Sequence, residues 1–181
     1  LQIPVDILSS ISTEGLVETC ISYPLYPEFI YFDSLYNGII SLENNFNGLK
    51  ELYQRKDAAM ELVQFYLGIN IKNLHNNHNF PQFHLSYLEF VLANQTIVDL
   101  MTSDERIILM RAVLNNTYER DSEERFSCED VSKALLLGRA LLKESTAFQE
   151  YLSNDLAFQT FILTGEQNAY RPVILEMRSF I

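Results

Sequence analysis

Tryptophan is absent from the sequence, and glycine and the basic residues are scarce. The six glycines follow neither a phosphate-loop nor a dinucleotide-binding spacing, so they give no support to a nucleotide site. Lys and Arg number 13 against 24 Asp and Glu, which gives the chain a net charge of −11. Because negative charge repels phosphate backbones, nucleic acid is not an expected partner.

Long apolar runs are missing as well. Apolar runs such as residues 134–137 and 161–163 fall far short of the roughly 18 residues that span a bilayer. We therefore expect no integral membrane segment. Hydrophobic residues still make up 48% of the chain, which is ordinary globular usage and is enough for one core. The sequence predicts a single helical domain over residues 1–181.

Cysteine occurs at only two positions. Cys20 and Cys128 permit one disulfide but do not establish it, because a free cysteine is also a common buried residue. The sequence begins at Leu1 and not at Met, so we expect that a preceding segment was removed, either at an artificial boundary or with a signal peptide.

Helical periodicity is what the sequence has in abundance. Three amphipathic two-helix units start near Asn47, Ser86 and Ser127, and their spacing of roughly forty residues is typical of HEAT and armadillo repeats. In the third unit, the second helix carries the apolar residues from Phe148 onward and is expected to stop at Gly165. The sequence therefore predicts an all-α fold, either an irregular α-solenoid of stacked helical hairpins or an irregular helical bundle.

The N-terminal third carries a resemblance to a known group of proteins. Residues 12–20 read STEGLVETC, residues 23–25 read YPL, and NFNGLKEL at 45–52 is followed by RKDA at 55–58. This pattern resembles the N-terminal part of uncharacterised secreted helical proteins of gut Bacteroidetes. The resemblance implies an exported location, periplasmic, cell-surface or secreted, in place of a cytoplasmic one, and it implies no activity.

All three histidines fall close together in the sequence. Three imidazoles can hold zinc or another transition metal and leave one coordination position open. However, His75 and His78 lie in an Asn-rich stretch that disfavours the helix needed to align them, and this stretch contains no carboxylate. A metal site at His75, His78 and His84 is therefore an alternative, and an ordinary polar connection is the favoured interpretation.

Aromatic residues are plentiful, with ten tyrosines and twelve phenylalanines. Those at helical spacing are expected in the core. Tyr23, Tyr26, Tyr31 and Tyr36 are denser than packing alone requires, and tyrosine is favoured at protein interfaces because it joins apolar area to a polar tip. These four tyrosines are the predicted partner-binding residues.

No catalytic residue and no cofactor is predicted. Carboxylate pairs such as Asp104 and Glu105 stand at helix starts, where they complement the helix dipole, and no nucleophile-elbow sequence is present. The favoured function is a non-catalytic helical interaction or scaffold domain that binds a protein partner. Two alternatives stay open: a metal-binding protein or metal-dependent enzyme that uses the histidines, and a carrier of an apolar ligand between helices.

Overall fold

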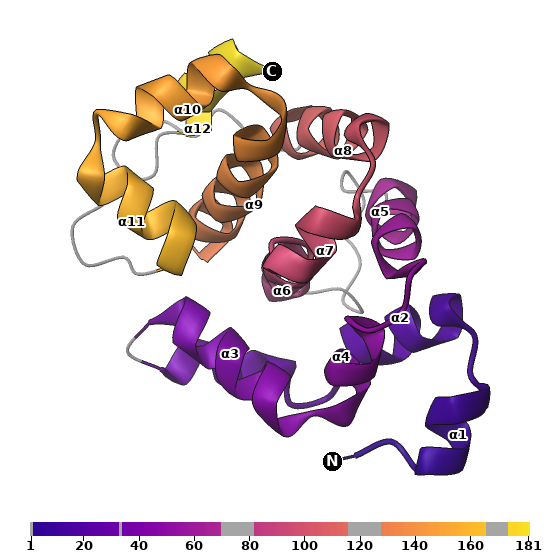
Figure 1. The fold of residues 1–181 in the computed structure, drawn as a ribbon. Coiled ribbons are helices and arrows are strands. Elements are labelled where there is room, and N and C mark those ends of the chain that lie inside the picture. The colour runs from indigo at the N-terminus through magenta and orange to yellow at the C-terminus, as the bar shows by residue number, and fades with distance from the viewer. Residues whose placement is uncertain (1, 33, 70–81, 116–127, 166–173) are drawn as a thin grey trace.

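The fold is built from helices alone in the residues that the structure describes. The computed structural model describes residues 2–32, 34–69, 82–115, 128–165 and 174–181 (Figure 1). In chain order, with η marking 3-10 helices, the elements are α1 (Val5–Ser10), α2 (Thr13–Ile21), η1 (Tyr26–Tyr31), α3 (Leu35–Asn45), α4 (Asn47–Leu52), α5 (Ala58–Gly68), α6 (Gln82–Leu92), α7 (Gln95–Leu100), α8 (Ser103–Asn115), α9 (Cys128–Glu144), α10 (Thr146–Ser153), α11 (Leu156–Thr164), α12 (Ile174–Met177) and η3 (Arg178–Phe180). The all-α prediction is confirmed.

Side-chain caps define where several helices begin. The hydroxyl of Ser12 accepts a hydrogen bond from the backbone N–H of Gly15 at 3.1 Å, which starts α2. The carboxylate of Asp155 does the same for α11 by accepting from Phe158 at 2.9 Å. These contacts satisfy N–H groups that have no partner inside a helix. At its other end, α11 stops at Gly165, whose φ of +73° is the left-handed conformation that glycine adopts readily.

Helix α9 lies at the centre of the molecule. All eleven residues from Val131 to Leu141 are buried, although a surface helix normally buries one stripe. Helices α6, α7, α8, α10, α11 and α12 pack against it, and Figure 1 shows α9 between the α10–α11 pair and the α6–α8 group. Even so, none of the described helices is long and apolar enough to cross a bilayer.

This packing favours the helical-bundle alternative. In a solenoid each repeat contacts only its neighbours along the stack, so no single helix is enclosed on every side. Here α9 is enclosed, and the contacts of α6 with both α2 and α3 join the N-terminal helices to the same body. The solenoid periodicity is not confirmed by the arrangement of the described helices.

Three arginines close the C-terminal ends of short helices. Arg55 donates to the carbonyls of Ile11 at 2.7 Å and Leu8 at 2.9 Å, at the end of α1. Arg106 donates to two carbonyls at the end of α7. Arg139, on α9, does the same for α6 and α11. A six-residue helix is not stable alone in water, so these contacts between distant segments help to hold α1 and α7 in place.

Gly138 allows α9 and α11 to approach closely, and this gives a first prediction. A Cβ atom at position 138 would lie 2.9 Å from Cγ1 of Ile162 and closer still to its Cδ1. We expect Gly138→Ala to lower the free energy of unfolding by about 1–3 kcal/mol, despite alanine's better helix propensity, because the core is overpacked. Urea unfolding followed by circular dichroism measures the change.

Two further variants separate overpacking from a backbone effect. A Cβ at Gly68 would meet no atom within 4 Å, so Gly68→Ala is expected to be neutral or slightly stabilising. Adding Ile162→Val to Gly138→Ala removes the atom closest to the new methyl group and should recover part of the loss. A Gly138→Ala variant as stable as the parent would show that α11 moves away freely.

Candidate functional site

The histidines predicted as metal ligands are only partly visible in the structure. His75 and His78 lie outside the described residues. His84 is in α6, where its ring lies against that of Tyr26 with centroids 3.9 Å apart, and burial lowers its pKa below the usual value. Within the described ranges, no three His, Cys, Asp or Glu side chains gather as a metal site would require. The metal site stays a prediction.

The four predicted partner-binding tyrosines do not form one surface. Tyr23 and Tyr26 are buried in the core. The hydroxyl of Tyr36 accepts a hydrogen bond from the Arg139 guanidinium at 3.1 Å, and the same guanidinium stacks over its ring. Tyr31 is 83% exposed and is the one of the four that a partner can reach readily. The clustering of tyrosines in the sequence cannot distinguish buried from exposed ones, because burial depends on which helices meet at η1.

Cys20 is a free thiol, so it does not form the disulfide that the sequence permitted. It lies in α2 with no exposed surface. Burial raises its pKa to about 12, although the charge of Arg55 acts in the opposite direction. A thiol whose pKa lies so far above neutral pH is almost never ionised to thiolate, so Cys20 is a core residue and not a nucleophile.

A buried polar cluster joins α5, α6 and α9. Lys133 forms an ion pair with Oε1 of Glu89 at 3.2 Å, and the Tyr66 hydroxyl donates to the same oxygen at 3.1 Å. The Ser132 hydroxyl donates to the other oxygen, Oε2, at 2.5 Å. Burial raises the pKa of Glu89, and the charge of Lys133 and the three hydrogen bonds partly offset this. We call these four residues the Glu–Lys cluster.

The Glu–Lys cluster stabilises the packing of the helices and has no room for a substrate. A serine beside a carboxylate and a lysine is a familiar catalytic combination, but a nucleophile needs space for a substrate. All four side chains are buried, with Glu89 and Ser132 at 0% exposure and Lys133 at 3%. Their polar atoms satisfy one another across three helices, which fixes how α5, α6 and α9 pack.

A sequence signal for this cluster does exist. Glu89 interrupts the apolar stretch from Leu85 to Leu92, and Lys133 interrupts the apolar stretch from Val131 onward. Two residues of opposite charge, each inside an otherwise apolar helix, are candidates for a buried ion pair. The pairing itself requires knowledge that α6 packs on α9, which the sequence does not contain.

An acidic groove lies between α2 and α5. It is a hollow of about 250 Å³, lined by Glu14, Val17, Glu18, Glu61, Gln64 and Phe65. In the part of the chain that the structure describes, none of the three glutamates forms an ion pair. Of the two apolar lining residues, Val17 is 1% exposed and Phe65 is partly buried, so Phe65 supplies the accessible apolar surface. Unpaired negative charge beside such a ring suits a cationic, amphipathic ligand.

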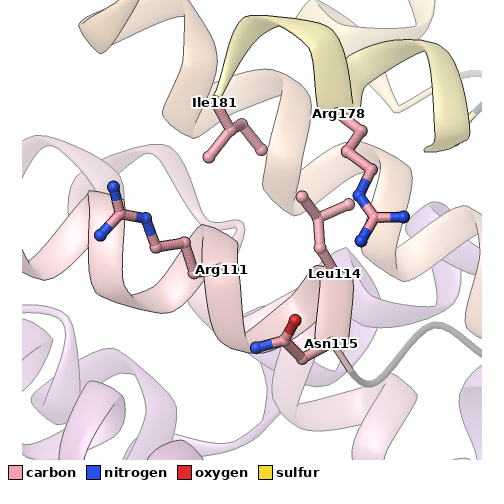
Figure 2. Close-up of a pocket in the computed structure, with 5 residues that line it drawn as sticks. All are labelled: Arg111, Leu114, Asn115, Arg178 and Ile181. Carbon is pink, nitrogen blue, oxygen red and sulfur yellow. The ribbon is translucent and has the colours of Figure 1, made fainter.

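An arginine pocket of about 290 Å³ lies on another part of the surface, where α8 meets η3. It is lined by Arg111, Leu114, Asn115, Arg178 and Ile181. Figure 2 shows Leu114 and Ile181 in the middle, with the guanidinium groups of Arg111 and Arg178 to either side. No pattern along the sequence indicates this site, because its two arginines are 67 positions apart and each stands among both charged and apolar residues.

Comparisons with known proteins supply no further guide to these sites. No family model, no curated protein and no solved structure matches the chain. The function must therefore be argued from the acidic groove, the arginine pocket and the exposed residues around them.

Proposed function

We propose that this chain is a non-catalytic helical interaction domain that binds a protein partner through the acidic groove. The observation that carries this proposal is the row of Glu14, Glu18 and Glu61, which form no ion pair with a described residue and lie beside the partly buried ring of Phe65. Protein interfaces combine a desolvated apolar centre with a charged rim in this way. The partner that fits is a basic, amphipathic segment.

The geometry of α2 and α5 supports a groove that extends beyond the hollow itself. Glu14 and Glu18 are four residues apart on α2, so they share one face of that helix. On α5, Met60 and Leu67 lie four and three positions from Gln64 and are 41% and 44% exposed. The acidic rim is thus continued by apolar side chains that a partner helix would cover.

Local charge also favours a basic partner over an acidic one. A chain with a net charge of −11 accelerates the approach of cations and repels anions, and a groove lined by carboxylates concentrates this effect. The exported location remains part of the proposal on the strength of the N-terminal resemblance alone. The buried Cys20 is compatible with either compartment.

The test uses a synthetic helical peptide that carries lysines on one face and leucines on the other. We expect binding to this peptide in the micromolar range and weakening as salt rises, because the contacts at the rim are screened. Glu18→Lys reverses one rim charge and should weaken binding at least about fivefold. Fluorescence anisotropy of the labelled peptide measures both effects.

The matched control is Glu150→Lys on α10, an exposed residue far from the groove lining that changes the net charge by the same amount. If Glu150→Lys weakens binding as much as Glu18→Lys, the peptide responds to net charge and not to the groove. That result would rule out the acidic groove as the interface. So would a Glu18→Lys variant that binds the peptide as tightly as the parent.

A further inference from the structure

The arginine pocket is notable because its two cations have no partner among the described residues. Most basic side chains in the described part of the chain are held by carboxylates or carbonyls. Lys50, Lys56, Arg111 and Arg178 make no ion pair and no side-chain hydrogen bond with any described residue. Two of these four cations border the same pocket, in a protein where acidic residues outnumber basic ones.

We propose that the arginine pocket binds a short, linear dicarboxylate with an aliphatic middle. Arg111 and Arg178 stand on opposite sides of the apolar pair Leu114 and Ile181, so one carboxylate meets each guanidinium while the methylene chain covers the pair (Figure 2). Guanidinium groups bind carboxylates with two parallel hydrogen bonds. The Asn115 amide adds a donor at the edge of the pocket.

Other anions fit these residues less well. A compact anion such as inorganic phosphate can reach one guanidinium but leaves Leu114 and Ile181 uncovered. A long polyanion such as nucleic acid extends over a surface that carries a net charge of −11 and is repelled there. A fatty acid satisfies one arginine and leaves the other without a partner. Two charges separated by a few methylene groups match both the cations and the apolar centre.

The experiment is a calorimetric titration of the protein with hexanedioate, with hexanoate and inorganic phosphate as comparison probes. We expect hexanedioate to bind with a dissociation constant on the order of millimolar, and hexanoate and phosphate to bind at least about fivefold more weakly. Arg111→Gln and Arg178→Gln should each weaken hexanedioate binding by about three- to tenfold. Both arginines are exposed, so these variants are expected to fold.

Lys56→Gln is the matched control, because it removes the same charge from an exposed and unpaired residue outside the pocket. It should leave hexanedioate binding unchanged. Equal losses in Lys56→Gln and Arg178→Gln, no heat from hexanedioate, or equal affinity for hexanoate would overturn the proposal. Tighter binding of the tripeptide Asp-Leu-Asp than of any dicarboxylate would reassign the pocket to an acidic protein segment.

Discussion

Replacing Lys133 with methionine is expected to lower the free energy of unfolding by about 3–5 kcal/mol at neutral pH. The substitution keeps much of the side-chain volume but leaves the Glu89 carboxylate charged in an interior where it has 0% exposure. The hydrogen bonds from Tyr66 and Ser132 remain, but they do not neutralise the charge. Urea unfolding followed by circular dichroism measures the loss.

The matched variant removes both charges. Glu89→Gln combined with Lys133→Met leaves no charge in the core. Tyr66 and Ser132 donate to different oxygens of Glu89, so the glutamine oxygen accepts from one hydroxyl and its NH2 group donates to the oxygen of the other. We expect it to recover at least about half of the loss, because breaking a buried ion pair costs more than removing it. A double variant as unstable as Lys133→Met alone would mean that lysine packing matters and that its charge does not.

The pH dependence of Lys133→Met follows from the raised pKa of Glu89. Burial raises that pKa, and the Lys133 charge is the largest influence that lowers it, so the variant raises it further. A carboxyl with a raised pKa in the folded state contributes stability that is complete below its unfolded pKa. That stability is lost as the pH rises through the folded pKa. The deficit of the variant should therefore be smaller at about pH 5 than at about pH 8.

The sequence was sufficient for the all-α class, but not for every helix boundary or for the arrangement of the helices. Periodicity predicts the all-α fold, and Gly165 ends α11 as expected because its position requires a left-handed backbone. The single helix expected from Phe148 onward is instead two, α10 and α11, because Asp155 caps a new helix start. A capping residue inside an apolar pattern is ambiguous until the surrounding packing decides which side chains can be buried.

Residues of the candidate sites were harder to predict, and the reason is physical. Tyr23 and Tyr31 have the same side chain, yet one is in the core and the other is 83% exposed. The acidic groove and the arginine pocket each draw residues from two helices, so neither is a motif along the chain. Charge at Glu18 or Arg178 suggests only a solvated surface until the opposite wall of the hollow is known.

Arg139→Ala is expected to destabilise the protein by about 4 kcal/mol or more. Arg139 is 3% exposed, and its guanidinium donates to the carbonyls of Ala93 at 2.7 Å, Ile162 at 2.9 Å and Leu163 at 3.2 Å. Without it, these carbonyls at the ends of α6 and α11 lose their donor inside the molecule. Each such loss costs about 1–3 kcal/mol.

Arg139→Lys tests whether charge alone is sufficient, and it is also the safer measurement if Arg139→Ala fails to fold. A lysine keeps the positive charge but lacks the planar fork that reaches two helix ends and stacks on Tyr36, so we expect it to lose about 2 kcal/mol. Lys56→Ala, an exposed and unpaired cation, should change stability by less than about 0.5 kcal/mol. If Arg139→Lys is as stable as the parent, the hydrogen-bond geometry is unimportant and Arg139 acts only through its charge on nearby groups. Glu43 is one such group, because burial raises its pKa and the Arg139 charge lowers it. If both variants lose stability, and Arg139→Ala loses more than Arg139→Lys because it keeps fewer hydrogen-bond donors, then one side chain joins the ends of α6 and α11.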